Sequence, residues 1–191
     1  VGKHWFIFHD FERPVGVTGV DPCSGDRPGL PTVSAALAYD DPESGKTIIL
    51  VVHQAISIPT MENNLLSPMQ MRLNDVKVHD VPKFLCDSPE DEHHSIVIDN
   101  GGGDILRIPL ALYGVISHFP TRKPTQFEFD TCEDRYELTY ELPDWEPHSE
   151  WFRRQEENVA DNTGRVRDTG DARTRRGVRD FIGSMVSRSL S

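Results

Sequence analysis

Long apolar runs are missing from this chain, and their absence excludes a membrane-spanning protein. Only 37% of its 191 residues are hydrophobic, and no run approaches the roughly 20 apolar residues that cross a bilayer as a helix. Fourteen Pro and fourteen Gly also leave few long periodic segments, which favours short strands and loops over a helical bundle. We therefore expect a soluble, mostly-β chain with no membrane partner, made of one domain plus an extension.

Cysteine is scarce as well. The three cysteines, Cys23, Cys86 and Cys132, are odd in number and far apart in the sequence. A disulfide scaffold would need an even set at close spacing, so this pattern indicates a reducing compartment. The location that we expect is cytoplasmic.

Motifs for metals, nucleotides and serine nucleophiles are also lacking. The eight histidines form no His-x3-His pair and accompany no Cys-x2-Cys, so the spacing of a zinc site is absent. The glycines at 101–103 are not followed by the Lys-Ser or Lys-Thr of a phosphate loop. Ser184 has no Gly-x-Ser-x-Gly frame. We expect no metal and no cofactor.

Net positive charge is found only at the C-terminal end. The net charge is −11, yet residues 151–191 hold nine Arg against six Asp and Glu. The acidic remainder argues against direct nucleic-acid binding by the body of the protein, because phosphate contacts need clustered Lys and Arg. The Arg-rich end could contact nucleic acid, but its composition is that of a solvated, disordered linker or tail, with a possible short helix over residues 178–186.

The most informative segment that is present covers residues 50–80. An apolar, β-branched run at residues 48–52 predicts a strand covered on both faces. After Pro59, Asn63 or Asn64 can cap a short helix. The helix would carry Leu65, Leu66, Met69 and Leu73 on one face. Alternation at residues 76–79 then predicts a half-exposed strand.

This order resembles the second half of a retropepsin subunit, the aspartic protease of retroviruses and LTR retrotransposons, and is most similar to copia-type elements. The residues that carry the likeness are Pro59 and Asn64-Leu65-Leu66-Ser67, followed by Met69, Met71 and Leu73. In that family a strand leads into an Asn-Leu-Leu helix, which packs behind the active-site loop, and then into a strand on the dimer side. The resemblance implies that Leu65 and Leu66 are both buried. The alternative without any relation to this family is a strand–helix–strand segment of the kind that any α/β domain can contain.

A flap is the second point of likeness. Residues 15–21 and 32–39 are β-prone, and the Gly/Pro-rich residues 22–31 lie between them, which predicts a hairpin. Retropepsins place the flap at this position in the chain. The resemblance therefore assigns substrate contact to Val17, Thr18, Gly19 and Val20, at a flexible tip.

The family's catalytic residue is not found in a suitable frame. Retropepsins need Asp-Thr/Ser-Gly after an apolar strand, and the family spacing places that loop a few residues before Val1. Asp168-Thr169-Gly170 does occur, but Arg165, Val166 and Arg167 precede it and Asp171 follows it. We therefore expect the catalytic Asp to lie before Val1, no catalytic residue within the chain, and no activity from the chain alone.

Taken together, the sequence predicts an acid-protease-like, retropepsin-type β-domain with one short helix over residues 1–86, a β-rich extension over residues 87–151 and a disordered tail over residues 152–191. Strands are expected at residues 95–98, 105–113 and 136–142. The resemblance implies an endopeptidase that cleaves the Gag-Pol polyprotein as a homodimer, by water activation between two aspartates. The alternative is a non-catalytic remnant or interaction module of a decayed element.

Overall fold

The computed structural model describes residues 1–18, 26–101, 103–142, 144, 146, 149–150 and 154. The chain divides into two compact units, Val1–Tyr140 and Glu141–Ser191. Every helix and strand named below belongs to the first unit. The tail predicted at residues 152–191 lies outside the described residues, apart from Arg154. Among the described residues no helix is long and apolar enough to cross a membrane.

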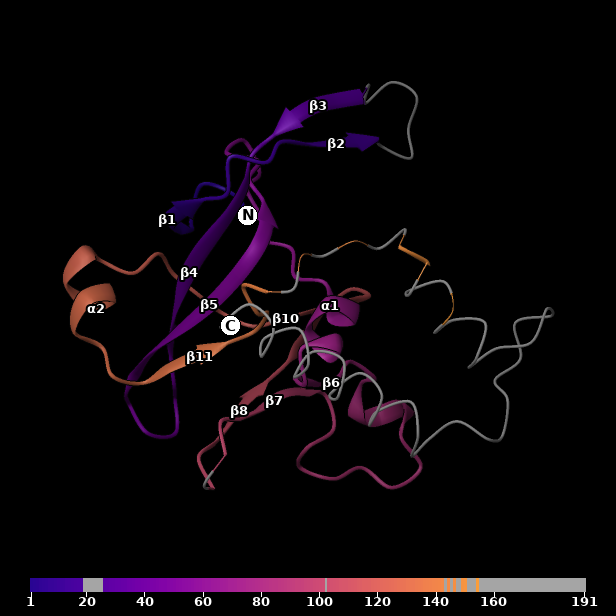
Figure 1. The fold of residues 1–191 in the computed structure, drawn as a ribbon. Coiled ribbons are helices and arrows are strands. Elements are labelled where there is room, and N and C mark those ends of the chain that lie inside the picture. Colours follow the sequence, from indigo (N-terminus) through magenta and orange to yellow (C-terminus); the bar gives the residue numbers. More distant parts are fainter. Residues whose placement is uncertain are drawn as a thin grey trace. The chain divides into compact units, whose positions relative to one another are not determined.

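Strands dominate the first unit, as the sequence predicts (Figure 1). In chain order the elements are β1 (Phe6–Asp10), β2 (Val15–Thr18), β3 (Asp26–Leu30), β4 (Thr32–Asp40), β5 (Thr47–Ile56), α1 (Pro68–Leu73), β6 (Lys77–His79), the 3-10 turn η2 (Lys83–Leu85), β7 (Ser95–Asp99), β8 (Ile105–Pro109), β9 (Ala111–Tyr113), β10 (Ile116–His118), α2 (Gln126–Thr131) and β11 (Arg135–Glu137).

The main sheet has the strand order β1-β4-β5-β11, and its long central pair is the antiparallel β4–β5 hairpin. β1 pairs antiparallel with β4, whereas β11 pairs parallel with β5 and lies at the edge. A separate antiparallel sheet has the order β6-β7-β8. Two hairpins, β2–β3 and β9–β10, complete the described strands. The strands predicted at residues 48–52 and 95–98 are confirmed.

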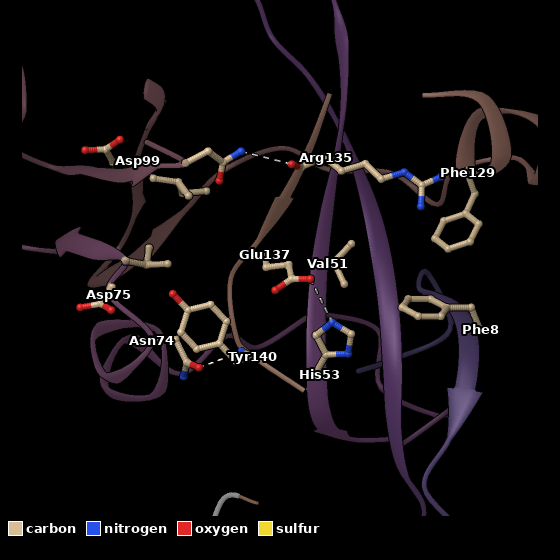
Figure 2. Close-up of a pocket in the computed structure, with 13 residues that line it drawn as sticks. Phe8, Val51, His53, Asn74, Asp75, Asp99, Phe129, Arg135, Glu137 and Tyr140 are labelled. Atoms are coloured by element: carbon tan, nitrogen blue, oxygen red, sulfur yellow. Dashed lines mark hydrogen bonds and ion pairs between the residues drawn. The ribbon is translucent and has the colours of Figure 1, made fainter. Parts of the chain in front are cut away.

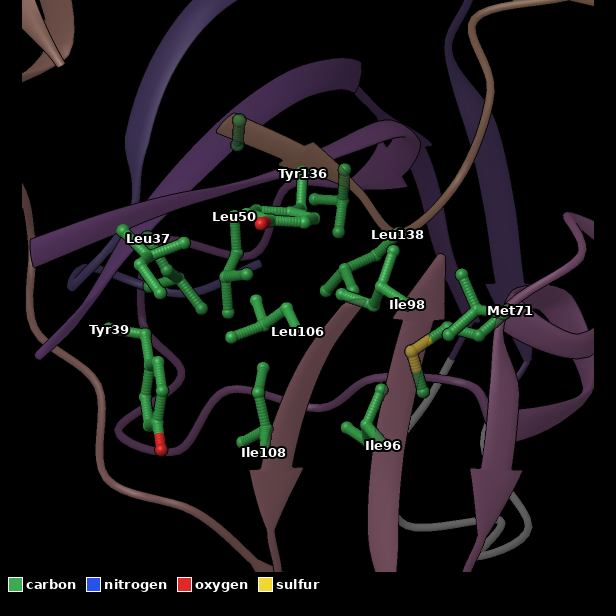
Figure 3. Packing of buried hydrophobic residues seen from close by; sticks show 14 of the residues in the cluster. Leu37, Tyr39, Leu50, Met71, Ile96, Ile98, Leu106, Ile108, Tyr136 and Leu138 are labelled. Carbon is green, nitrogen blue, oxygen red and sulfur yellow. The ribbon is translucent and has the colours of Figure 1, made fainter. Parts of the chain in front are cut away.

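Continuous burial of β4 and β5 has a simple cause. Alternate side chains on one face, such as Leu37 and Leu50, pack with Ile98, Leu106 and Ile108 of the β6-β7-β8 sheet (Figure 3). The opposite face is covered too. Its cluster consists of Ala36, Ala38, Ile49 and Val51, with Phe6, Phe129 and Cys132 packed against them. Strands covered on both faces carry nearly continuous apolar runs, and the sequence shows such runs at residues 35–39 and 48–52.

The boundary expected at residue 86 does not appear. Residues 1–140 form one compact unit, and its main apolar cluster contains side chains from both sides of that position, among them Leu50, Met71, Ile98 and Ile108. The expected β-rich extension is therefore part of the same core, because the β6-β7-β8 sheet supplies one of the two layers.

Arg122 connects three segments on the surface of this unit. Its guanidinium group donates to Asp40 at the end of β4 and to Glu128 in α2, at distances of 2.6–2.9 Å. Glu128 also completes a capping box with Thr125 at the start of α2. These hydrogen bonds, from Arg122 first and Thr125 second, lower the pKa of Glu128 to about 2.

We predict that Glu128→Gln destabilises the protein by on the order of 1 kcal/mol at neutral pH. Because the pKa of Glu128 is lower in the folded state, its carboxylate contributes stability above the unfolded value of 4.5. That contribution falls as pH drops from 4.5 toward about 2. Urea unfolding of both proteins across this range measures it.

Glu133→Gln is the matched control, because Glu133 is exposed just beyond α2. Its effect on the free energy of unfolding should be small. An equal loss in both variants, or a Glu128→Gln difference that persists at low pH, would contradict the role given to Glu128.

Candidate functional site

The predicted flap region is a hairpin, but its second arm differs from the prediction. β2 pairs with β3, which lies inside the segment expected to be the turn. Val17 pairs with Arg27 and Thr18 with Asp26. Gly19 and Val20 lie outside the described residues. Figure 1 shows this two-stranded hairpin extending away from β4 and β5.

The reason for the difference is a bulge and a buried strand. The β2–β3 register shifts between Val15 and Val17, opposite Pro28-Gly29. Gly29 has φ +74°, a left-handed value that glycine tolerates, and bulges also accommodate Pro in a strand. The segment predicted as the second arm becomes β4, because its apolar residues are needed between β1 and β5 in the core.

The Asn-Leu-Leu segment leads into a helix, but the helix begins later than predicted. α1 starts at Pro68, and the side chain of Ser67 caps it by accepting a hydrogen bond from Gln70 N. Pro is well suited to the first helical position, and it forces the preceding residue into an extended conformation. Ser67 accordingly has φ −89° and ψ 110°. The prediction that Asn63 or Asn64 caps the helix was wrong.

Because the helix begins later, the two leucines before it are not both buried. Leu65 is 68% exposed, so the predicted burial of both leucines was wrong for Leu65. Leu66 is half-buried and packs against the main apolar cluster. Within α1 only Met71 is buried. The predicted strand after the helix is confirmed as β6.

The first residues of the chain run beside the segment that leads to Asn64. Val1 N donates to Ile56 O at 2.6 Å, and Ile58 N donates to Val1 O at 2.8 Å. Gly2 contacts Met61 so closely that a Cβ atom on Gly2 would lie 2.4 Å from the Met61 carbonyl oxygen. Trp5 is buried a few residues later. A peptide segment joined to Val1 would therefore start next to the strand end that precedes the Asn-Leu-Leu segment.

A hollow of about 430 Å³ lies along the outer edge of β11, lined by Val51 and Phe129 from the smaller apolar cluster and by Val76 and Ile98 from the large one. Figure 2 shows Phe8, Phe129 and Val51 on one side of it. Its polar lining is mainly acidic or amide. These residues are His53, Asn74, Asp75, Asp99, Asn100, Arg135, Glu137 and Tyr140.

His53 is held at the wall of this hollow by two neighbours. Ser34 Oγ lies 2.8 Å from His53 Nδ1, and Glu137 Oε1 lies 3.8 Å from His53 Nε2. This arrangement of a serine, an imidazole and a carboxylate contains the residue types of a hydrolase triad. The spacing of these residues in the sequence did not predict that they lie together. Ser34 is only 1% exposed, so its hydroxyl cannot reach a substrate. We assign Ser34 to orienting the His53 ring.

The histidines and acidic residues give no metal centre in the described part of the chain. No group of three or more possible ligands is close enough to hold an ion there. His94 Nε2 lies 3.0 Å from Ser117 Oγ. The triplet Asp168-Thr169-Gly170 lies outside the described residues.

Comparisons with known proteins add no assignment. No family model, no curated protein and no solved structure matches this chain.

Proposed function

We propose that residues 1–140 form the body of one subunit of an aspartic endopeptidase, of the retropepsin type that copia-type retrotransposons use to cleave the Gag-Pol polyprotein. In this proposal the catalytic Asp is supplied by a loop that precedes Val1. Two subunits each contribute one Asp, and the two carboxylates share a proton so that one can activate water while the other acts as an acid.

One observation carries the proposal. The first residues of the chain pack against residues 56–61, directly before Asn64-Leu65-Leu66-Ser67. A catalytic loop joined to Val1 would thus lie beside the segment that, in the family, leads into the helix packed behind that loop. The order that follows, from β5 through the Asn-Leu-Leu segment to α1 and β6, is the order that the resemblance requires.

The β2–β3 hairpin supports the same proposal. It lies in the chain between the N-terminal residues and the Asn-Leu-Leu segment, where the family has its flap. Its two strands pair with each other and with no other strand of the described residues. A hairpin joined to the core only at its base can close over a bound polypeptide, which is the role proposed for Val17 and Thr18. The exposure of Leu65 is the point at which the segment departs from the expectation.

The test adds an apolar strand and Asp-Thr-Gly in front of Val1. Cleavage of quenched fluorescent casein is measured for residues 1–191, for the extended chain, and for the extended chain with Asn in place of the new Asp. Only the extended chain with Asp should cleave, as a dimer in sedimentation, with an acidic pH optimum, since one carboxylate of the pair must be protonated.

The controls separate two further outcomes. Activity of residues 1–191 that disappears with Asp168→Asn would contradict the proposal and assign the catalysis to the tail triplet. An extended chain that folds and dimerises but does not cleave would favour the alternative function, a non-catalytic interaction module. The acidic hollow beside β11 is the observation that favours this alternative.

A further inference from the structure

The outer edge of β11 has backbone groups that no strand of the described residues uses. β11 is the last strand of its sheet. Ile49 N donates to Asp134 O at 2.9 Å, and Leu138 N donates to Val51 O at 2.8 Å. Because successive residues of a strand direct their N–H and C=O groups to opposite sides, Arg135 and Glu137 direct theirs away from β5.

Two asparagines mark the limits of this edge. Asn100 Nδ2 donates to Arg135 O at 3.4 Å, and Tyr140 N donates to Asn74 Oδ1 at 2.7 Å (Figure 2). The N–H and C=O of Glu137 lie between them. Since β11 is paired only with β5 in the described sheet, these two groups are available to one residue of an added strand.

The side chains around this edge select for a basic residue. Cross-strand neighbours lie on the same face of a sheet, so a residue opposite Glu137 would direct its side chain beside the Glu137 carboxylate. Asp99 lines the same hollow. Its one Arg, Arg135, lies over the Phe129 ring at 4.7 Å. The hollow therefore has an excess of negative charge.

The flanking positions of an added strand would meet apolar groups. Side chains alternate along a strand, so the neighbours of the basic residue would point to the other face. Val76 and Ile98 line the hollow there. An extended segment with the pattern apolar–basic–apolar fits both faces of the edge.

We propose that the hollow along β11 binds an extended peptide with a central Lys or Arg, which adds to the edge of the sheet through the N–H and C=O of Glu137. Two main-chain hydrogen bonds set the register, and the carboxylates of Glu137 and Asp99 set the preference for positive charge. This site is separate from the β2–β3 hairpin and does not depend on peptidase activity.

The experiment uses the full chain and two fluorescein-labelled heptapeptide libraries with random ends, one centred on Val-Lys-Val and one on Val-Glu-Val. Binding is measured by fluorescence anisotropy. We expect the lysine library to bind about tenfold or more tightly than the glutamate library. A version with N-methylated lysine, which cannot donate its main-chain N–H, should bind about tenfold more weakly than its parent.

Variants at Glu137 separate the backbone from the side chain. Glu137→Pro removes the outward N–H but no hydrogen bond to β5, and proline is tolerated at such an edge. It should abolish binding, whereas Glu137→Gln keeps the backbone groups and should weaken the lysine preference. Near-ultraviolet circular dichroism checks that both variants fold. If Glu137→Pro does not fold, the N-methylated peptides decide the question.

Three results would overturn the proposal. Equal binding of both libraries would remove the role of the carboxylates. Equal binding of N-methylated and parent peptides would exclude strand addition. A dimer that dissociates in Glu137→Pro, without any peptide binding, would assign the edge to a second copy of the chain instead.

Discussion

Replacing Leu50 with Ala is expected to lower the free energy of unfolding by about 2–5 kcal/mol. Leu50 is fully buried on β5, and Figure 3 shows its side chain between Leu37, Leu106 and Tyr136. Removing three carbon atoms there leaves a cavity between two sheets, and sheets held by many other side chains cannot collapse into it. Urea unfolding measures the loss as a lower midpoint.

Leu65→Ala is the matched control, since it removes the same atoms from a side chain that is 68% exposed. Its effect should stay within about 0.5 kcal/mol. Leu66→Ala should fall between the two, because Leu66 is half-buried against the cluster. A large loss for Leu65→Ala would show that this side chain is covered in solution, as the retropepsin resemblance originally implied.

The second large effect is expected from Gly2→Ala. A Cβ atom at this position would lie 2.4 Å from the carbonyl oxygen of Met61, and this oxygen belongs to the backbone and not to a flexible side-chain end. Residues 1–5 must then move away from residues 56–61, which opens the packing around Trp5. We expect a loss of about 1–3 kcal/mol in the free energy of unfolding.

The same variant tests the proposed function. In the chain extended by a catalytic loop, Gly2→Ala should also reduce peptidase activity strongly, because the loop would no longer be held beside the Asn-Leu-Leu segment. Gly16→Ala is the control: it lies on β2 with nothing within 4 Å of the new Cβ, and it should change stability little. Equal losses at both glycines would contradict the close contact of Gly2 with Met61.

Local pattern was enough for much of the fold. The β-branched run at residues 48–52 and the alternation at residues 76–79 predicted β5 and β6, because burial on two faces or one face fixes which residue types a strand can carry. The helix between them was also predicted, but its start was not. Pro68 should have indicated it, since a residue before Pro is unfavourable inside a helix.

The sequence did not predict which strands pair or which distant side chains come into contact. The partner of β2 could not be chosen between residues 26–30 and 32–40, because both are extended and only the need to fill the core assigns the second to β4. The sequence also did not predict the hollow along β11. His53 and Glu137 are 84 positions apart in the numbering, and they meet because β11 pairs in parallel with β5.

The sequence by itself determined the β-rich class, the strand–helix–strand order around Pro59 and the acidic character of the body, since these follow from residue types and their local spacing. Only the tertiary structure decided that residues 87–140 share a core with the rest, that Leu65 is exposed, and that β11 leaves an open edge beside acidic side chains. The physical reason is that burial and strand pairing depend on contacts between residues far apart in the chain, which no local pattern encodes.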